Sequence, residues 1–113
     1  MSKARQKGTT FESAVVAYMR ENGFPDAERW GSTTMDQGDV RNIPIVLEAK
    51  NHKAMALSEW CSQAAASSQK AGKLWAVVHK RARKGTSEAY VTMSLENFCI
   101  IIQNFVAKDL TEP

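Results

Sequence analysis

The sequence predicts an α/β protein in which a central mixed sheet is flanked by helices. Two observations predict this class. Hydrophobic residues follow helical and strand-like periods in the order helix, three strands, helix, two strands, helix. The chain of 113 residues, 43% of them hydrophobic, can bury one core but is short for two. We therefore expect a single domain over residues 1–113, with residues 1–8 as a basic N-terminal tail.

The first expected helix covers residues 9–22. Its apolar residues recur three and four positions apart from Phe11 to Met19, and the Asn22-Gly23 pair ends it. The helical period then disappears. A small meander is expected next, because β-like segments separated by glycine, asparagine and proline lie at residues 28–31, 39–41 and 45–50.

A second helix is expected over residues 57–71, with Ser58 as its N-cap and Gly72 at its end. The continuous apolar run over residues 74–79 has the length of a strand, which predicts a central strand covered on both faces. The chain is completed by a basic loop, a final strand and a helix capped by Ser94, over residues 80–87, 88–93 and 95 to about 107.

Positive charge is distributed unevenly along the chain, whose formal net charge is +3. Nine of the fifteen basic residues lie in two segments that contain no acid, namely Lys3, Arg5, Lys7, Lys70, Lys73, Lys80, Arg81, Arg83 and Lys84. The rest of the chain therefore carries six bases against twelve acids. Such segregation can attract a polyanion such as DNA or RNA, although a short basic run is more often a solvated tail or loop.

Neither secretion nor membrane insertion is expected. The two cysteines, Cys61 and Cys99, are too few for a disulfide framework and lack the paired spacing of a zinc site. No apolar run approaches the ~20 residues of a membrane span, and no hydrophobic segment follows the charged first residues. We therefore expect a cytoplasmic protein that has no membrane association.

Two carboxylates are expected to face each other across the hairpin around Ile43-Pro44, because Asp39 and Glu48 are equidistant from that turn. Opposed like charges destabilise a sheet unless a cation lies between them, and oxygen ligands suit Mg²⁺ or Mn²⁺. Lys50 lies on the same strand face as Glu48, since strand side chains alternate. The alternative is an ordinary surface strand, on which Lys50 neutralises the two acids.

The sequence Gly38-Asp39, followed by Glu48-Ala49-Lys50 within an αβββαβ order, resembles the PD-(D/E)XK nuclease superfamily. Nearly the whole chain takes part in the resemblance, which implies a restriction-endonuclease-like core with an added C-terminal helix. Within the superfamily the chain looks most like the small Holliday junction resolvases of the phage and archaeal type. That narrower likeness depends on the compact size, on Glu12 in the first helix and on the segment Val77-Val78-His79-Lys80-Arg81. Gly38 stands where the family motif has proline, an exchange expected to matter little because that proline does not contact the metal.

The resemblance implies that Asp39, Glu48 and the backbone carbonyl of Ala49 bind Mg²⁺, for which Mn²⁺ could substitute. It implies that Lys50 serves the attacking water and that Glu12 adds an outer acid to the metal site. Glu12 has a second interpretation, since Thr9 and Glu12 have the spacing of a capping box at a helix start. Gln63, on the second helix, is a further catalytic candidate, and its alternative is an ordinary surface amide.

Candidate DNA contacts combine the basic tail, the loop after the central strand and two nearby residues: Lys3, Arg5, Lys7, Lys53, His79, Lys80, Arg81, Arg83 and Lys84. His79 has the alternative of a satisfied histidine at the end of a strand. For Lys53 the alternative is a solvated charge. Trp30 and Trp60 are assigned to packing.

The resemblance implies a metal-dependent, structure-selective DNA endonuclease that acts on four-way junctions, in the bacterial host cytoplasm if the protein is phage-encoded. A nicking or repair nuclease on duplex DNA is one alternative, and a non-catalytic nucleic-acid-binding protein on the same scaffold is another. Residues 98–106 are more apolar than one helical stripe, which favours a homodimer. The alternative for this last helix is deep burial within the monomer.

Overall fold

The computed structural model describes residues 3–30 and 38–111, with side chains over residues 10–30 and 38–106. Its elements follow the expected order, with one short 3₁₀ helix, η1, in addition. They are α1 (Lys3–Glu21), β1 (Glu28–Arg29), β2 (Val40–Arg41), β3 (Ile45–Lys50), α2 (Leu57–Ala71), β4 (Leu74–His79), η1 (Thr86–Glu88), β5 (Tyr90–Thr92) and α3 (Leu95–Thr111). The predicted α/β class is confirmed, and β3, α2 and β4 have their predicted bounds.

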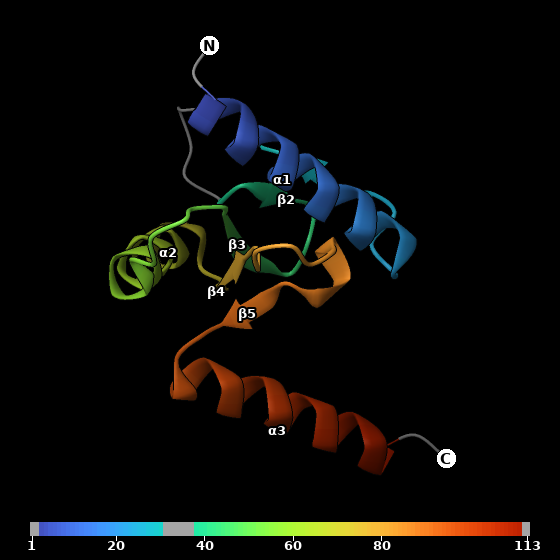
Figure 1. Ribbon diagram of the computed structural model, residues 1–113. Helices are drawn as coiled ribbons and strands as arrows, with labels where there is room; N and C mark the ends of the chain where they lie inside the picture. The colour runs from blue at the N-terminus through green and yellow to red at the C-terminus, as the bar shows by residue number, and fades with distance from the viewer. Residues whose placement is uncertain (1–2, 31–37, 112–113) are drawn as a thin grey trace.

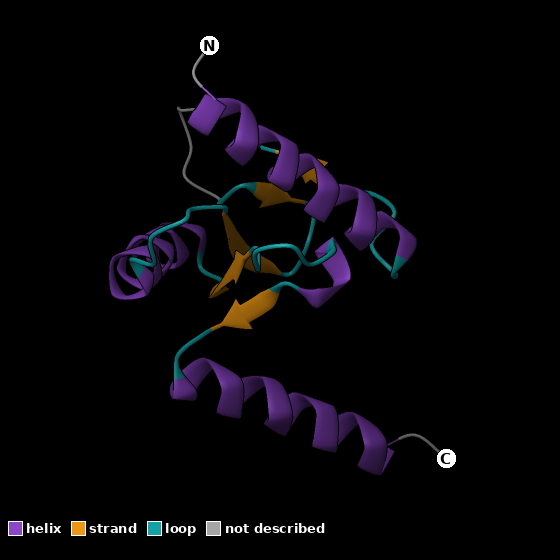
Figure 2. Ribbon diagram, viewed as in Figure 1, coloured by secondary structure: helices purple, strands orange, loops and turns teal. Residues whose placement is uncertain are grey.

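The five described strands form one mixed sheet in the order β1-β2-β3-β4-β5. β3 and β4 are parallel, and α2 forms the crossover between them, whereas the other neighbouring strands are antiparallel. Figures 1 and 2 show α1 and α2 packed on the central strands from different sides. Because β3 and β4 are parallel neighbours, their carboxyl ends lie side by side at the same end of the sheet.

Two apolar clusters cover the two faces of the sheet. On one face, Leu47 of β3 and Val78 of β4 pack with Phe11 and Val15 of α1. On the other face, Val77 packs with Trp60 of α2 and its neighbours. Since Val77 and Val78 are consecutive and both buried, β4 is covered on both faces as predicted.

α1 begins at Lys3, earlier than the predicted start at Thr9, so the basic segment is helical from Lys3 instead of forming an extended tail. The physical reason is intrinsic propensity, because lysine, alanine, arginine and glutamine are strong helix formers. That propensity outweighs the unfavourable interaction of positive charges with the positive end of the helix dipole. Thr9 now lies inside the helix, so the capping-box interpretation of Glu12 is wrong.

The helix ends test three further predictions. α2 has Ala56 at its N-cap without a side-chain hydrogen bond, so the predicted Ser58 cap is wrong. Gly72 ends α2 as predicted, in a left-handed conformation with φ 66°. Ser94 caps α3 as predicted, since its Oγ accepts a hydrogen bond of 3.1 Å from the Asn97 N–H.

α3 leaves the rest of the fold after β5 and lies apart from the two helices that pack on the sheet (Figure 1). At its start, the Asn97 side chain donates a hydrogen bond of 3.0 Å to the Trp75 carbonyl. Its apolar side chains are exposed, including Leu95 at 76% and Phe105 at 66%. The alternative of deep burial is therefore wrong for the described side chains of α3. Within the described part of the chain, no helix has the length and apolar composition that crossing a membrane requires.

Candidate functional site

Asp39 lies beside β3, directly before the observed pair of Val40 with Leu47. A position directly opposite Glu48 stays a prediction, because Asp39 lies outside the paired residues of β2. The Asp39 N–H donates to the Leu47 carbonyl at 2.8 Å, and the Ala49 N–H donates to Oδ2 of Asp39 at 2.7 Å. The Asp39 carboxylate thus takes the place of a backbone acceptor beside β3, just before β2 begins.

Gly38 sets the position of Asp39 by a close approach to β3. It adopts φ 82°, and a Cβ atom there would lie 2.8 Å from the Leu47 carbonyl oxygen. A side chain fits neither this contact nor this left-handed conformation, and proline is locked near φ −65°. The backbone at this position therefore requires glycine, and the expectation that the exchange matters little to the metal site stays a prediction.

Glu48 and Lys50 point to the side of the sheet that α2 covers. Leu47 and Ala49 belong to the cluster on the α1 side, so the alternating residues face the other way. Glu48 is only 9% exposed, and its neighbours Val46, Leu47 and Ala49 in the strand are apolar and buried. A buried carboxylate is costly to accommodate for packing alone, which makes Glu48 a functional candidate.

The donor atoms at this point suit a divalent cation. The N–H and C=O of one strand residue point to the same edge, so the Ala49 carbonyl is directed to the side on which Asp39 lies. Two carboxylates and a carbonyl are hard oxygen donors of the kind that Mg²⁺ and Mn²⁺ bind, with waters completing the shell. Among the described residues, no three His, Cys, Asp or Glu side chains form a metal-binding group.

Glu12 lies on the α1 side and is paired with arginine. Its Oε2 accepts a hydrogen bond of 2.8 Å from Nε of Arg29, which pairs with Val40 in the sheet. The described structure does not bring Glu12 together with Asp39 and Glu48 in one metal-binding group. Its role as an outer acid stays a prediction.

Gln63 is exposed on α2, and its backbone carbonyl accepts a hydrogen bond of 3.2 Å from the Ser67 hydroxyl. The next residue, Ala64, is the one that packs on the sheet. A catalytic role for the Gln63 amide stays a prediction.

A cavity of about 680 Å³ opens beyond the carboxyl ends of β3 and β4. It is lined by side chains from the segments after these strands and from β5: Asn51, His52, Lys53, Met55, His79, Lys80, Arg81, Ala82, Arg83 and Tyr90. Most of the DNA contacts predicted within residues 38–106 thus line a single cavity. Lys84 does not line it, and the side chains of Lys3, Arg5 and Lys7 lie outside the described residues.

Four rings contact one another in sequence, and the first and last of them, His52 and Tyr90, line this cavity. The ring centroids of His52 and Trp60 are 5.4 Å apart, those of Trp60 and His79 are 6.3 Å apart, and those of His79 and Tyr90 are 6.1 Å apart. His79 is also held by a hydrogen bond of 2.8 Å between Nε2 and the Thr92 hydroxyl. Burial lowers the pKa of His79 below its ordinary value, because the neutral ring needs less hydration than the charged one.

The basic loop is held in a tight turn. The Lys84 N–H donates to the Arg81 carbonyl at 3.2 Å, and Nζ of Lys80 donates to the carbonyls of Arg81 and Lys84 at 3.3 and 3.2 Å. Arg83 adopts φ 63°, which is unfavourable for residues other than glycine. The guanidinium of Arg81 lies 4.2 Å from the centroid of the Tyr90 ring.

His52 and Tyr90 are cavity residues that sequence reasoning missed. His52 follows Lys50 by two positions, and Tyr90 pairs with His79 in the antiparallel register of β4 and β5. The polar run Asn51-His52-Lys53 directly after an apolar strand is a signal that could have pointed to His52. Nothing local points to Tyr90, which reaches the cavity only through the pairing of β5 with β4.

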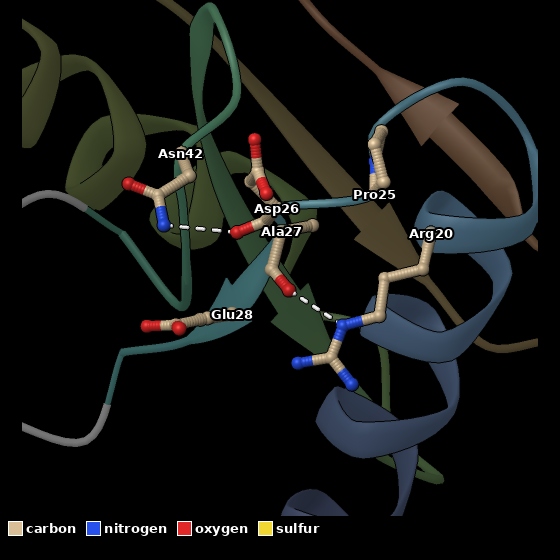
Figure 3. A pocket seen from close by; sticks show the side chains of 6 residues that line it. All are labelled: Arg20, Pro25, Asp26, Ala27, Glu28 and Asn42. Carbon is tan, nitrogen blue, oxygen red and sulfur yellow. Dashed lines mark hydrogen bonds between the residues drawn. The ribbon is translucent and has the colours of Figure 1, made fainter.

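A second cavity, of about 500 Å³, lies between the end of α1 and the turn after β2 (Figure 3). Nε of Arg20 donates to the Ala27 carbonyl at 2.7 Å, and Nδ2 of Asn42 donates to the Asp26 carbonyl at 2.9 Å. Glu28 bonds to Arg41 across β1 and β2. These contacts tie β1 to α1 and β2, so the polar groups here stabilise the fold.

Comparison with protein-family models, with curated proteins and with solved structures finds no match to this chain.

Proposed function

We propose that the protein is a metal-dependent DNA endonuclease with the restriction-endonuclease-like arrangement of the PD-(D/E)XK superfamily. The observation that supports it most is the Asp39 carboxylate, which the Ala49 N–H fixes against β3 at 2.7 Å, next to the buried Glu48 in that strand. Lys50 follows Glu48 on the same face of β3. A packing role alone would not favour a buried glutamate at this position.

Hydrolysis of a phosphodiester adds water across one P–O bond, so that the water oxygen bonds to phosphorus and the leaving oxygen takes a proton. Asp39, Glu48 and the Ala49 carbonyl would hold Mg²⁺, or Mn²⁺ in its place. When bound, the cation would polarise the scissile phosphate and lower the pKa of a coordinated water. The Lys50 ammonium would orient the attacking water or neutralise the charge that develops on the phosphate.

The test is a cleavage assay on labelled four-way junction, flap and duplex DNA of matched sequence, with and without Mg²⁺. We expect products only with the cation, and none from the Asp39→Asn variant, which can still accept the hydrogen bond from Ala49. Arg20→Ala is the matched control, because it changes a charged residue of the second cavity. No cleavage of any substrate by folded protein, or equal cleavage by Asp39→Asn, would overturn the proposal.

The proposed substrate is the four-way junction, cut by a homodimer that meets through α3. From Phe98 to Val106 the described side chains of this helix are exposed, and Glu96 is its one charged residue among residues 95–106. A helix that is apolar on more than one side is stabilised when another surface buries its apolar side chains. The same helix of a second copy could do so without charge repulsion. A two-fold dimer also supplies two sites for paired cuts.

Duplex DNA is the alternative substrate, cut by a nicking or repair nuclease on the same site. A non-catalytic nucleic-acid-binding protein is a second candidate, favoured by the concentration of cations in the cavity beyond β3 and β4. Such a protein would bind DNA equally well with and without Mg²⁺ and cut none of the three substrates. The cleavage assay therefore separates the candidates.

A further inference from the structure

We propose that the cavity beyond β3 and β4 binds one unpaired nucleotide, with its base against the aromatic side chains and its phosphate against the cations. The inference rests on the proposed function only in taking DNA as the ligand. It adds a substrate class, namely DNA that has an unpaired nucleotide next to the bond to be cut.

The cavity has the size and the two kinds of wall that a nucleotide needs. Its volume of about 680 Å³ lies within the ~300–1,000 Å³ range of small-molecule sites. His52, Met55 and Tyr90 supply apolar and aromatic surface, while the positive charge comes from Lys53, Lys80, Arg81 and Arg83. The described lining residues include no acid, so nothing among them repels a phosphate.

The aromatic wall is built on the core. Trp60 and His79 are 5% and 7% exposed and contact each other; Trp60 also contacts the ring of His52, and His79 that of Tyr90. Tyr90 itself is 54% exposed, so the core does not account for its position. Rings that are exposed but held from behind are suited to stacking with a base, which presents a free π-face only when it leaves a duplex.

The cationic wall contains an arginine in a conformation that favours glycine. Arg83 adopts φ 63° in the turn closed by the Lys84 N–H and the Arg81 carbonyl. Glycine would fit this turn without strain. Arginine at this position lowers the stability of the turn but places a cation at the cavity. The Arg81 guanidinium lies over the Tyr90 ring at 4.2 Å from its centroid, which places a cation with several N–H donors beside the ring that would hold the base.

The cavity adjoins the candidate carboxylates through one pair of residues. His79 lines the cavity, and its neighbour in the parallel register is Lys50. A nucleotide held in the cavity would therefore be next to the bond that Lys50 serves in the proposed hydrolysis.

The experiment measures binding of labelled single-stranded DNA and of duplex of the same sequence, in buffer without divalent cation. A second probe carries one 2-aminopurine, whose fluorescence falls when the base stacks. We expect Tyr90→Leu to weaken single-strand binding about 5- to 100-fold, with the quenching lost and duplex binding little changed. Tyr18→Leu, at an exposed tyrosine of α1, is the matched control and should leave both affinities unchanged.

Two further variants cover a loss of folding in Tyr90→Leu. His52→Ala changes an exposed ring and should weaken single-strand binding without changing the thermal melt. Arg83→Gly should weaken binding while raising the melting temperature. Unchanged single-strand affinity in folded Tyr90→Leu and His52→Ala, or an equal loss for duplex, would overturn the inference. A native protein that binds through Tyr90 but cleaves nothing would refute the nuclease and keep the nucleotide site.

Discussion

Lys50 and His79 are direct neighbours in the parallel register of β3 and β4. Lys50 is the last residue of β3, on the face that carries Glu48, and His79 is the last residue of β4 and lines the cavity. This pair therefore joins the two carboxylates to the cationic and aromatic surface beyond the strands. Under the proposed function, a phosphate bound in the cavity would therefore lie next to the carboxylates.

The first prediction separates the chemistry of Asp39 from its structural role. Asp39→Asn and Asp39→Ala should both abolish cleavage, but only the alanine variant loses the acceptor for the Ala49 N–H. A hydrogen bond to a charged group contributes about 1.5–3 kcal/mol, so Asp39→Ala should be the less stable of the two by an amount of this order. Urea unfolding together with the cleavage assay checks both effects.

Glu48→Gln and Lys50→Ala should also abolish cleavage with little loss of stability. Glutamine matches the shape of glutamate and removes a buried charge that is expected to face Asp39, so Glu48→Gln should be slightly more stable than the native protein without Mg²⁺. Circular dichroism and thermal melts measure this. Native cleavage rates in either variant would show that the two residues do not serve the reaction.

Gly38→Ala should destabilise the protein more than Gly23→Ala. Both glycines have positive φ, 82° and 106°, and alanine in such a conformation costs about 1–2 kcal/mol. A Cβ atom at Gly23 meets nothing within 4 Å, whereas one at Gly38 would lie 2.8 Å from the Leu47 carbonyl oxygen. Urea unfolding gives the loss of unfolding free energy in each variant, and the difference between the two losses measures the cost of the contact between Cβ and the Leu47 carbonyl. Equal losses would show that β2 can shift away from β3.

The central elements could be predicted from the sequence because their patterns are local. The apolar run predicts the bounds of β4, and Gly72 predicts the end of α2. The turn at Ile43-Pro44 predicts the register in which Val40 pairs with Leu47. The apolar period does not predict the start of α1, because the period begins only at Phe11 whereas the helix begins at Lys3.

The cavity could not be predicted as a unit, because His52 and Tyr90 are far apart in the sequence. Two strand pairings, one parallel and one antiparallel, bring them to the same place. The apolar sequence of α3 indicates that it needs cover, yet the pattern cannot say which surface provides it. These features depend on tertiary structure, which hydrophobic periods do not encode.

Stability should fall in acid partly because of His79. Burial lowers the pKa of His79 in the folded protein below its ordinary value of about 6.5, which the unfolded chain keeps. The unfolded state then binds the proton more readily, so this contribution is complete above about pH 6.5 and is lost as the pH falls through the folded pKa. Urea unfolding between pH 8 and pH 5 should show a smaller loss for His79→Gln than for the native protein, and equal slopes would contradict the prediction.

Removing charge from the cavity should change the salt dependence of DNA binding. Arg81→Ala and Arg83→Ala should each reduce the slope of log affinity against log salt by up to ~0.9 on duplex DNA and ~0.7 on single strands. Lys70→Ala is the control, because this exposed lysine on α2 does not line the cavity. Lys80→Ala is less informative, since Lys80 also holds the carbonyls of the turn. Unchanged slopes for both arginine variants would show that the loop faces away from DNA.

The last prediction concerns assembly through α3. Phe105 is 66% exposed and Ile101 is 37% exposed, so a glutamate at either position is tolerated by the monomer but is costly to bury in an interface. Phe105→Glu and Ile101→Glu should each give a soluble monomer, whereas Tyr18→Glu, a similar change on α1, should leave the dimer intact.

The monomer keeps Asp39, Glu48 and Lys50, so it should still nick DNA slowly but lose paired, symmetric cuts and most of its preference for four-way junctions over duplex. Light scattering, free and with junction DNA, together with the cleavage assay measures both effects. A native protein that is monomeric at micromolar concentration in both conditions would contradict the dimer and favour the nicking nuclease.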